Sequence, residues 1–313
     1  MRNMVCHARA VEEKRQRKLR QNKMTREEFR ELIKEKGPVI LDGGTGSCLR
    51  KMGMPVGVCT EQWVYDHPEE IARLQREYAD AGSMVIYAPT FGANRETLKG
   101  MGLEANVEVL NRELVKRTKE NVGDRVLIAG DMSTTGKGLE PYGPMTYDSM
   151  MEIYKEQISL LAEAGVDLLV AETLLSQDEA TVICDAAREV CDLPLIISFT
   201  CEGDGTLYFG GTVFEAAATM EAMGADAVGV NCSVGPDQLS AVISQLHKTV
   251  SIPVVAKPNA GMPTITETGE AVYSMKKEEF TRHLLHLRDC GASVVGGCCG
   301  TTPEYIADVK KNL

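Results

Sequence analysis

The sequence lacks long apolar runs. Its 313 residues contain no stretch of about 18 apolar residues, so the sequence predicts no transmembrane helix. The first residues carry charge but lack the apolar stretch that a secretory signal requires. Positive charge is also in short supply, because 34 Lys and Arg stand against 45 Asp and Glu for a net charge of −11. This balance argues against nucleic acid or an anionic membrane as a partner.

The sequence also lacks low-complexity segments and an evident interdomain linker. With 43% hydrophobic and 25% charged residues, it has the composition of a globular protein that can form a full core. Residues 1–23 differ, since they hold eight Lys or Arg, two Glu and few apolar residues. We therefore expect a basic N-terminal extension over 1–23 and a single domain over 24–313. The extension is either a solvated segment, a stretch upstream of a natural start at Met24, or a docking arm for an acidic partner.

The ten cysteines do not fit a disulfide framework, because a chain of this length does not need one. Cys298 and Cys299 are adjacent, which is awkward for a disulfide. In a chain without an export signal, clustered cysteines more often bind metal or take part in chemistry. These features predict a reducing, cytoplasmic setting.

Short apolar, β-branched segments alternate with amphipathic segments from Thr25 onward. This alternation is typical of parallel βαβ units, and eight such units predict an α/β fold, the (β/α)8 TIM barrel. An open doubly wound sheet is the alternative, but the segment 42–46 matches the dinucleotide-binding glycine pattern poorly. The predicted strands are Val39–Leu41, Met84–Tyr87, Val126–Ala129, Leu168–Ala171, Leu195–Phe199, Ala227–Val230, Val254–Ala256 and Ser293–Val295. The predicted helices include Glu69–Ala81, Ser149–Ala164, Thr212–Met223, Pro236–Lys248 and Lys277–Cys290.

Three cysteines follow strands whose ends should meet. In a TIM barrel the functional residues lie at the C-terminal ends of the strands. Cys232 closes the sixth predicted strand, and Cys298 and Cys299 close the eighth. Three thiolates can hold Zn²⁺ and leave its fourth position open, as in a reactive rather than a structural site, and the flanking glycines let both adjacent cysteines reach one ion. The alternative is that each thiol is simply part of the core.

An open zinc–thiolate site favours one kind of chemistry. Three thiolates leave negative charge on the ion, so bound water is less acidic than at a His-rich site, and activation of a thiol substrate is the better prediction.

Two carboxylates follow strands one and four. Asp42 and Glu172 could hold an ammonium group. N–H groups of the Gly43-Gly44-Thr45 turn, or of the helix start at Thr301-Thr302-Pro303, could receive a carboxylate. Either carboxylate alone could equally be a helix cap or a salt-bridge partner. Together with the zinc site they predict a pocket for a small α-amino acid that carries a thiol.

Several motifs together resemble the homocysteine S-methyltransferase family, and most closely the homocysteine-binding module of cobalamin-dependent methionine synthase. The resemblance begins at about Pro38 and runs to the C-terminus, and the cysteine motif is its most specific part. The motifs are Leu41-Asp42-Gly43-Gly44-Thr45-Gly46, Ala171-Glu172-Thr173, Gly229-Val230-Asn231-Cys232-Ser233, Lys257-Pro258-Asn259-Ala260-Gly261 and Gly296-Gly297-Cys298-Cys299-Gly300-Thr301-Thr302-Pro303-Glu304. Two further motifs resemble the methionine synthase branch more than the betaine-using branch: Gly130-Asp131 with Thr135-Gly136-Lys137, and Phe209-Gly210-Gly211-Thr212.

The resemblance implies a zinc-containing barrel that methylates the sulfur of L-homocysteine to give methionine. It assigns zinc ligation to Cys232, Cys298 and Cys299. It assigns the homocysteine amino group to Asp42 and Glu172. It further implies that Asn231 lies near the metal and that Asn259 supports the ligand loop.

The resemblance leaves the identity of the methyl donor undetermined. Methionine synthases continue into folate-, cobalamin- and activation modules, which this sequence does not show, so methylcobalamin would come from a separate corrinoid protein. S-methylmethionine, S-adenosylmethionine and betaine are alternative donors, and another small thiol is an alternative acceptor.

Two different classes of function compete with this one. Lys257 closes the seventh predicted strand, where a barrel lysine could form a Schiff base in a lyase. A non-enzymatic zinc holder or corrinoid-protein partner is the other class, but mere zinc storage would not require Asp42 and Glu172.

Overall fold

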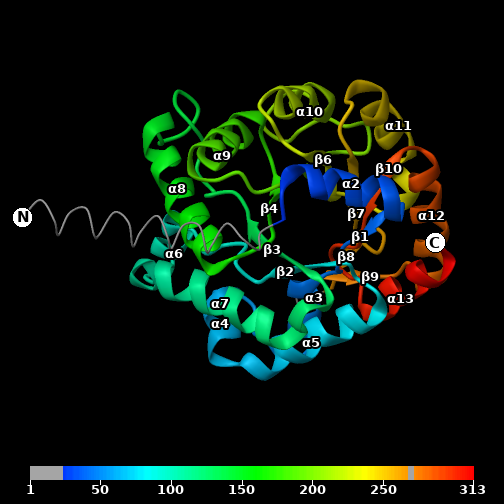
Figure 1. Cartoon of the computed structure of the whole chain (residues 1–313), viewed down its shortest axis with the longest axis horizontal. Coiled ribbons are helices and arrows are strands. Elements are labelled where there is room, and N and C mark those ends of the chain that lie inside the picture. Colours follow the sequence, from blue (N-terminus) through cyan, green and yellow to red (C-terminus); the bar gives the residue numbers. More distant parts are fainter. Residues whose placement is uncertain (1–23, 267–270) are drawn as a thin grey trace, which may run out of the picture.

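The computed structural model describes residues 24–266 and 271–313, so the predicted extension over residues 1–23 lies outside the described residues. Eight strands form one parallel sheet in the order β1-β10-β7-β6-β5-β4-β3-β2, and helices surround it (Figure 1). The predicted TIM barrel is confirmed. No helix in the described ranges is both long enough and apolar enough to cross a membrane.

The eight barrel strands lie where the alternation predicts them. They are β1 (Val39–Ile40), β2 (Val85–Ala88), β3 (Leu127–Met132), β4 (Leu168–Leu174), β5 (Leu195–Phe199), β6 (Ala227–Cys232), β7 (Val254–Pro258) and β10 (Ala292–Val295). The helices are α2 (Arg26–Lys36), α3 (Thr45–Lys51), α4 (Thr60–Asp66), α5 (Pro68–Ala81), α6 (Arg95–Lys99), α7 (Val107–Val122), α8 (Tyr147–Ala164), α9 (Gln177–Val190), α10 (Val213–Ala222), α11 (Ser240–Thr249), α12 (Lys277–Asp289) and α13 (Pro303–Asn312).

Some element boundaries differ from the predicted ones. The predicted helix Pro236–Lys248 is divided into a 3₁₀ turn, Pro236–Gln238, and α11. Strands β3 and β4 continue through Asp131 and Glu172, so these carboxylates lie within strands rather than after them. A hairpin of β8 (Pro263–Ile265) and β9 (Ala271–Tyr273) inside the β7–α12 connection was not predicted, because its strands are short and mostly exposed.

The strand alternation fills the barrel with one apolar cluster. Alternate strand residues, among them Leu41, Val170 and Val255, pack together inside the barrel. Successive side chains of a strand point to opposite faces, so later alternate positions along β3, β4, β6 and β7 also belong to the interior. The last of these inward positions are polar: Asp131, Glu172, Asn231 and Lys257. The inner wall therefore changes from apolar to polar toward the C-terminal ends of the strands.

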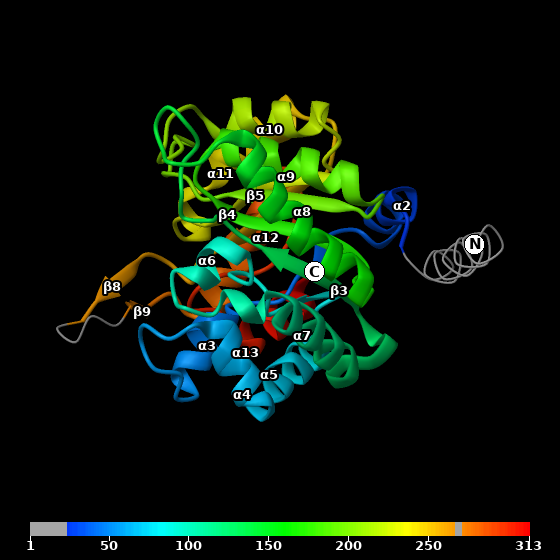
Figure 2. The same ribbon diagram turned by 90° about the vertical axis from the view of Figure 1, so that its left-hand side faces the viewer.

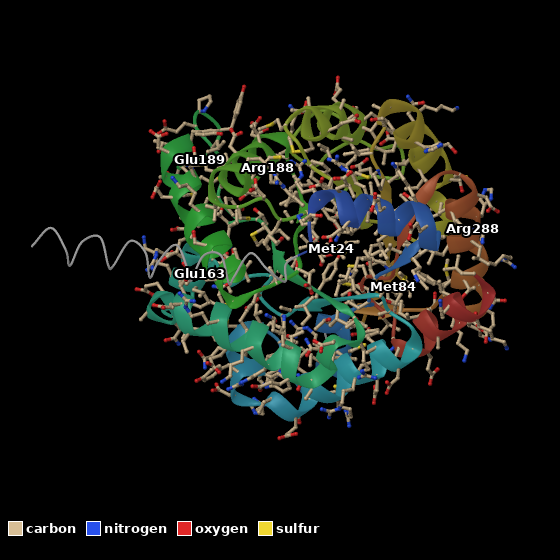
Figure 3. The ribbon with its side chains drawn as sticks, in the orientation of Figure 1. Met24, Met84, Glu163, Arg188, Glu189 and Arg288 are labelled. Atoms are coloured by element: carbon tan, nitrogen blue, oxygen red, sulfur yellow. The ribbon has the colours of Figure 1, made fainter. Side chains whose placement is uncertain are left out.

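Helix α2 closes the N-terminal end of the barrel. Thr25 and Glu28 form a capping box at its start, and Phe29 and Ile33 enter the interior cluster. Figure 2 shows α2 and the β8–β9 hairpin at opposite ends of the barrel. Figure 3 labels Met24 and Met84, which pack against the same cluster near the centre of that view. The C-terminal end is thus the end left for a site.

Hydrogen bonds between the β1 and β2 segments complete the ring. The N–H of Met84 donates to the carbonyl of Ile40 at 2.7 Å. The N–H of Tyr87 donates to Oδ2 of Asp42 at 2.9 Å. The Asp42 side chain therefore joins two strand ends and is fixed at the mouth of the barrel.

Candidate functional site

The three predicted cysteines meet at the barrel mouth. The sulfur atoms of Cys232, Cys298 and Cys299 all lie within 4.8 Å of one another. Cys232 Sγ and Cys299 Sγ are 4.0 Å apart, and Cys298 is buried while the other two are partly exposed. The meeting follows from the strand order, because β7 alone separates β6 from β10.

The backbone at this site departs from regular strand geometry. Cys232 and Ser233 both adopt φ of 55°, which is uncommon for residues with a side chain. This turn aims the Cys232 thiol back over the barrel end, and the Ser233 hydroxyl holds it by accepting from the N–H of Cys201 at 2.9 Å. Gly44 is required opposite, since a Cβ there would lie 2.5 Å from the carbonyl oxygen of Cys298.

The three sulfur atoms also influence one another's protonation. Hydrogen bonds with Cys232 and then Cys298 lower the pKa of the Cys299 thiol to about 3, despite its burial. Hydrogen bonds to Cys298 and Cys299 raise the pKa of Cys232. The hydroxyl of Tyr273, on β9, is also hydrogen-bonded to Cys299. Cys299 is therefore the most readily ionised of the three thiols.

This sulfur cluster fits a tetrahedral zinc ion. With Zn–S bonds of about 2.3 Å, two sulfurs of a tetrahedral site lie about 3.8 Å apart, close to the 4.0 Å between Cys232 and Cys299. Thiolates are soft ligands that suit zinc, whereas oxygen-preferring ions such as Mg²⁺ or Ca²⁺ do not fit this donor set. Three ligands leave one position for a further donor.

Asp42 and Glu172 lie together at the mouth, with the ammonium of Lys257 beside both. Lys257 Nζ is 3.8 Å from Asp42 Oδ1 and 3.5 Å from Glu172 Oε2, and all three side chains are under 10% exposed. The Lys257 Nζ also lies 4.7 Å from the centre of the Tyr87 ring. The sequence places these residues at strand ends, but this internal ion-pair group was not predicted.

Burial raises the pKa of both carboxyl groups. It raises the pKa of Asp42 to about 6 and that of Glu172 to about 7, although Lys257 acts in the opposite direction. Burial acts to lower the pKa of Lys257, but Glu172 and Asp42 raise it well above its ordinary value. Lys257 is therefore a cation, whereas a Schiff-base nucleophile must be a neutral amine, so the geometry disfavours the lyase alternative.

Several buried acceptor atoms at the mouth have no hydrogen-bond donor within the described residues. They are Asp42 Oδ1, Glu172 Oε2, Asp131 Oδ1 and Asn259 Oδ1. Buried polar atoms are normally paired, so a group of unpaired acceptors indicates a place for a ligand with donors. Asp131 is a site residue that the sequence analysis did not select, although its position two residues after the inward Ala129 is a signal that could have found it.

Asn231 lies beside the cysteines, but its amide is already engaged. Its Oδ1 accepts from the N–H of Thr173 at 2.7 Å and from the Ser198 hydroxyl at 2.8 Å. Its Nδ2 donates to Thr173 Oγ1 at 2.7 Å, which holds Thr173 at a φ of 61° directly after Glu172. In this arrangement Asn231 positions the Glu172 segment rather than presenting a free oxygen to a metal.

The glycine turn is close to the cysteines but only partly free. The N–H of Gly44 donates to Thr301 Oγ1 at 3.0 Å, so it is not available to a substrate carboxylate. Gly43 is packed against Tyr78 and Thr301, and Thr45 begins helix α3. Asn259 Nδ2 donates to the carbonyl of Ser233 at 3.3 Å, next to Cys232.

Comparison with known proteins agrees with this geometry. The family model described as homocysteine S-methyltransferase matches residues 39–313. A methionine synthase from Mycobacterium leprae is 29% identical over 266 residues, which are 80% of this chain and 22% of that protein. Homocysteine S-methyltransferase 4 from Zea mays is 28% identical over 305 residues, which are 88% of this chain and 89% of that protein.

The solved structures confirm the fold. The metallated form of the homocysteine methyltransferase MmuM from Escherichia coli superposes with a TM-score of 0.74 at 20% identity, covering 91% of this chain and 99% of that one. The fold and the three-cysteine site together define a TIM-barrel protein with a candidate metal centre. The chain belongs to the homocysteine S-methyltransferase family. It spans only 22% of the length of the mycobacterial methionine synthases that it matches.

Proposed function

We propose that the protein is a zinc-dependent methyltransferase that converts L-homocysteine to methionine. The observation that carries this proposal is the meeting of three cysteine sulfurs with buried carboxylate oxygens that accept no hydrogen bond within the described ranges, at one barrel mouth. Family membership supports homocysteine as the acceptor. The proposal includes the reducing, cytoplasmic setting that the cysteine content predicts.

Each group of residues would have a distinct task. Cys232, Cys298 and Cys299 would hold zinc, which when bound stabilises a substrate thiol as its nucleophilic thiolate. Asp42 and Glu172 would accept hydrogen bonds from the acceptor's ammonium group, and the Gly43–Thr45 turn would lie beside its carboxylate. This orientation directs the acceptor sulfur out of the barrel mouth, toward a donor. The sulfur gains the methyl group, the donor loses it, and the thiol proton is released.

We further propose that the donor is a methylcorrinoid on a separate protein. The similarity to methionine synthases supports this donor, and so does the surface of the mouth. Large apolar side chains are exposed on connections that follow β1, β3, β5 and β7, at the same end as the cysteines. They include Val56, Tyr142, Phe209 and Ile265, which are 74%, 95%, 74% and 63% exposed. An apolar rim of this kind is typical of a surface that another protein covers.

A donor panel tests both parts. Zinc-loaded protein is mixed with homocysteine and, in turn, methylcobalamin, S-methylmethionine, S-adenosylmethionine and betaine, and methionine is measured by mass spectrometry. Stopped-flow absorbance follows methylcobalamin, and we expect the cob(I)alamin spectrum to appear only with homocysteine and intact Cys298. Methionine formed from a small donor, without corrinoid conversion, would refute the corrinoid part alone. Methionine from none of the donors would refute the whole function.

A further inference from the structure

A third carboxylate lies in the pocket of Asp42 and Glu172. Asp131 stands on β3, next to the β4 strand that carries Glu172, and is 6% exposed. Its side chain points into the barrel, because it follows the inward Ala129 by two residues. Its Oδ1 is buried and accepts no hydrogen bond from the described residues. Burying a carboxylate oxygen without a hydrogen-bond donor costs folding free energy unless a ligand supplies that donor.

The backbone of Asp131 is held firmly while its carboxylate stays free. The Thr90 hydroxyl donates to the Asp131 carbonyl at 2.8 Å, and the N–H of Asp131 donates back to that hydroxyl at 3.2 Å. Gln157 Nε2 in turn donates to the Thr90 carbonyl at 2.8 Å. This chain of contacts fixes the direction of the Asp131 side chain, as a preorganised binding group requires.

Carboxyl groups outnumber ammonium groups among these buried side chains. Those of Asp42, Asp131 and Glu172 face one ammonium, that of Lys257, and burial, followed by the nearby Glu172, raises the pKa of Asp131 well above its ordinary value. Lys257 Nζ lies at ion-pair distance from Asp42 Oδ1 and Glu172 Oε2, whereas Asp131 has no ion-pair partner within the described ranges and its buried Oδ1 accepts no hydrogen bond there. Buried charges are stable when they are paired, so an added cation with N–H donors would stabilise the ionised forms of these carboxyl groups.

We propose that Asp131 is a third binding carboxylate for the amino group of the acceptor, and that Lys257 is the fixed cation that lets three carboxylates share the pocket. This inference rests on the proposed function, since it assumes an amino-thiol acceptor. It makes Asp131 a specificity residue, which favours a thiol with an ammonium group over the same thiol without one.

The test compares two acceptors that differ only in the amine. Homocysteine and 4-mercaptobutyrate, which lacks the amino group, are titrated into zinc-loaded full-length protein by calorimetry, with no donor present. For the near-isosteric Asp131→Asn, we expect homocysteine affinity to fall by about tenfold or more, because a charge-assisted contact is lost. The affinity for 4-mercaptobutyrate should change by less than about twofold, and zinc content should stay the same.

Asp124→Asn is the matched control, because Asp124 is exposed and precedes the same strand at the opposite end. It should leave both affinities unchanged. An equal loss for both thiols in Asp131→Asn would assign Asp131 a structural role and overturn the inference, as would a wild-type protein that binds both thiols alike. Methionine formation by a variant with an unchanged preference would remove the inference while the proposed function stands.

Discussion

The two ends of the barrel treat their buried carboxylates in opposite ways. At the N-terminal end, Asp226 is fully buried and accepts from Arg26 Nε at 2.9 Å, from Arg30 at 2.8 Å and from the N–H of Leu195 at 3.0 Å. At the C-terminal end, Asp42 and Glu172 each keep a buried oxygen without a donor. The Asp226 carboxylate has its hydrogen bonds completed within the chain, whereas each of the two mouth carboxylates keeps an oxygen that accepts none.

Backbone geometry follows the same division. The non-glycine residues with positive φ among the described ranges are Thr173, Cys232 and Ser233, and all three lie at the C-terminal end. Strained backbone and unpaired acceptors both cost stability, and both are typical of binding sites. The comparison teaches that the α2 end stabilises the barrel, whereas the mouth holds acceptor groups whose missing hydrogen bonds a ligand would supply.

The largest expected effect concerns the cysteines. Replacing Cys232, Cys298 or Cys299 with Ala removes one of three thiolates, so zinc affinity should fall by more than about 100-fold. Metal analysis of each purified variant measures the loss. Cys184→Ala is the control, because this buried thiol of α9 should leave zinc content unchanged. Full zinc content in all three site variants would contradict the metal centre.

A pair of charge-removing variants tests the comparison directly. Asp226→Asn should lower the free energy of unfolding by about 2–3 kcal/mol, since several charge-assisted hydrogen bonds are weakened. Glu172→Gln should not lower it at pH 8, because burial already disfavours the ionised carboxylate, whose pKa is raised to about 7. Urea unfolding measures both values. Equal losses at the two ends would break the comparison.

Homocysteine affinity should depend on the carboxylates of the mouth and not on Asp226. Glu172→Gln and Asp42→Asn should keep zinc but weaken homocysteine binding by about 1.5–3 kcal/mol each, because a charged acceptor for the ammonium is lost. Asp226→Asn should bind homocysteine as the wild type does. Titration calorimetry on the zinc-loaded proteins checks this, and an unchanged affinity in the two mouth variants would assign those carboxylates a structural role.

The pH dependence of ligand binding should reflect the raised pKa values of the carboxyl groups at the mouth. The raised pKa values of Glu172, about 7, and Asp42, about 6, mean that both lose their charge as the pH falls through this range. Affinity for an ammonium ligand should therefore decrease as the pH falls. For the same reason these groups lower stability as the pH rises, since their folded-state pKa values exceed the unfolded ones.

L-2-aminobutyrate separates this effect from thiol ionisation, because it has the amino and carboxyl groups of homocysteine without the sulfur. Its binding, followed by competition against homocysteine, should weaken below about pH 7 in the wild type. Glu172→Gln should lose the step near pH 7. A flat profile in the wild type would show that these carboxylates do not contact the amine.

The smallest expected effect concerns the hairpin. Tyr273→Phe removes a hydroxyl that is hydrogen-bonded to Cys299, while the ring can stay packed against Gly300. Zinc should remain bound, and the methyl-transfer rate should change by less than about tenfold, since one hydrogen bond is worth about 0.5–3 kcal/mol. Loss of zinc in this variant would show that β9 belongs to the metal centre itself.

The sequence by itself determined the barrel and the meeting of the three cysteines. Regular alternation of apolar strands and amphipathic helices leaves few alternatives to eight parallel βαβ units, and the strand order then brings Cys232 next to Cys298 and Cys299. Asp42 and Glu172 were predictable for the same reason, because local pattern places a residue at the inner end of a strand.

Only the tertiary structure decided how the charges pair across the barrel. Lys257, Asp42 and Glu172 come from three strands, and no sequence spacing states that an ammonium of β7 lies between carboxylates of β1 and β4. Asn231 likewise pairs with Thr173 on another strand. Inward alternation places a side chain on a face, but the partner it meets depends on side-chain length, burial and the stagger of the strands.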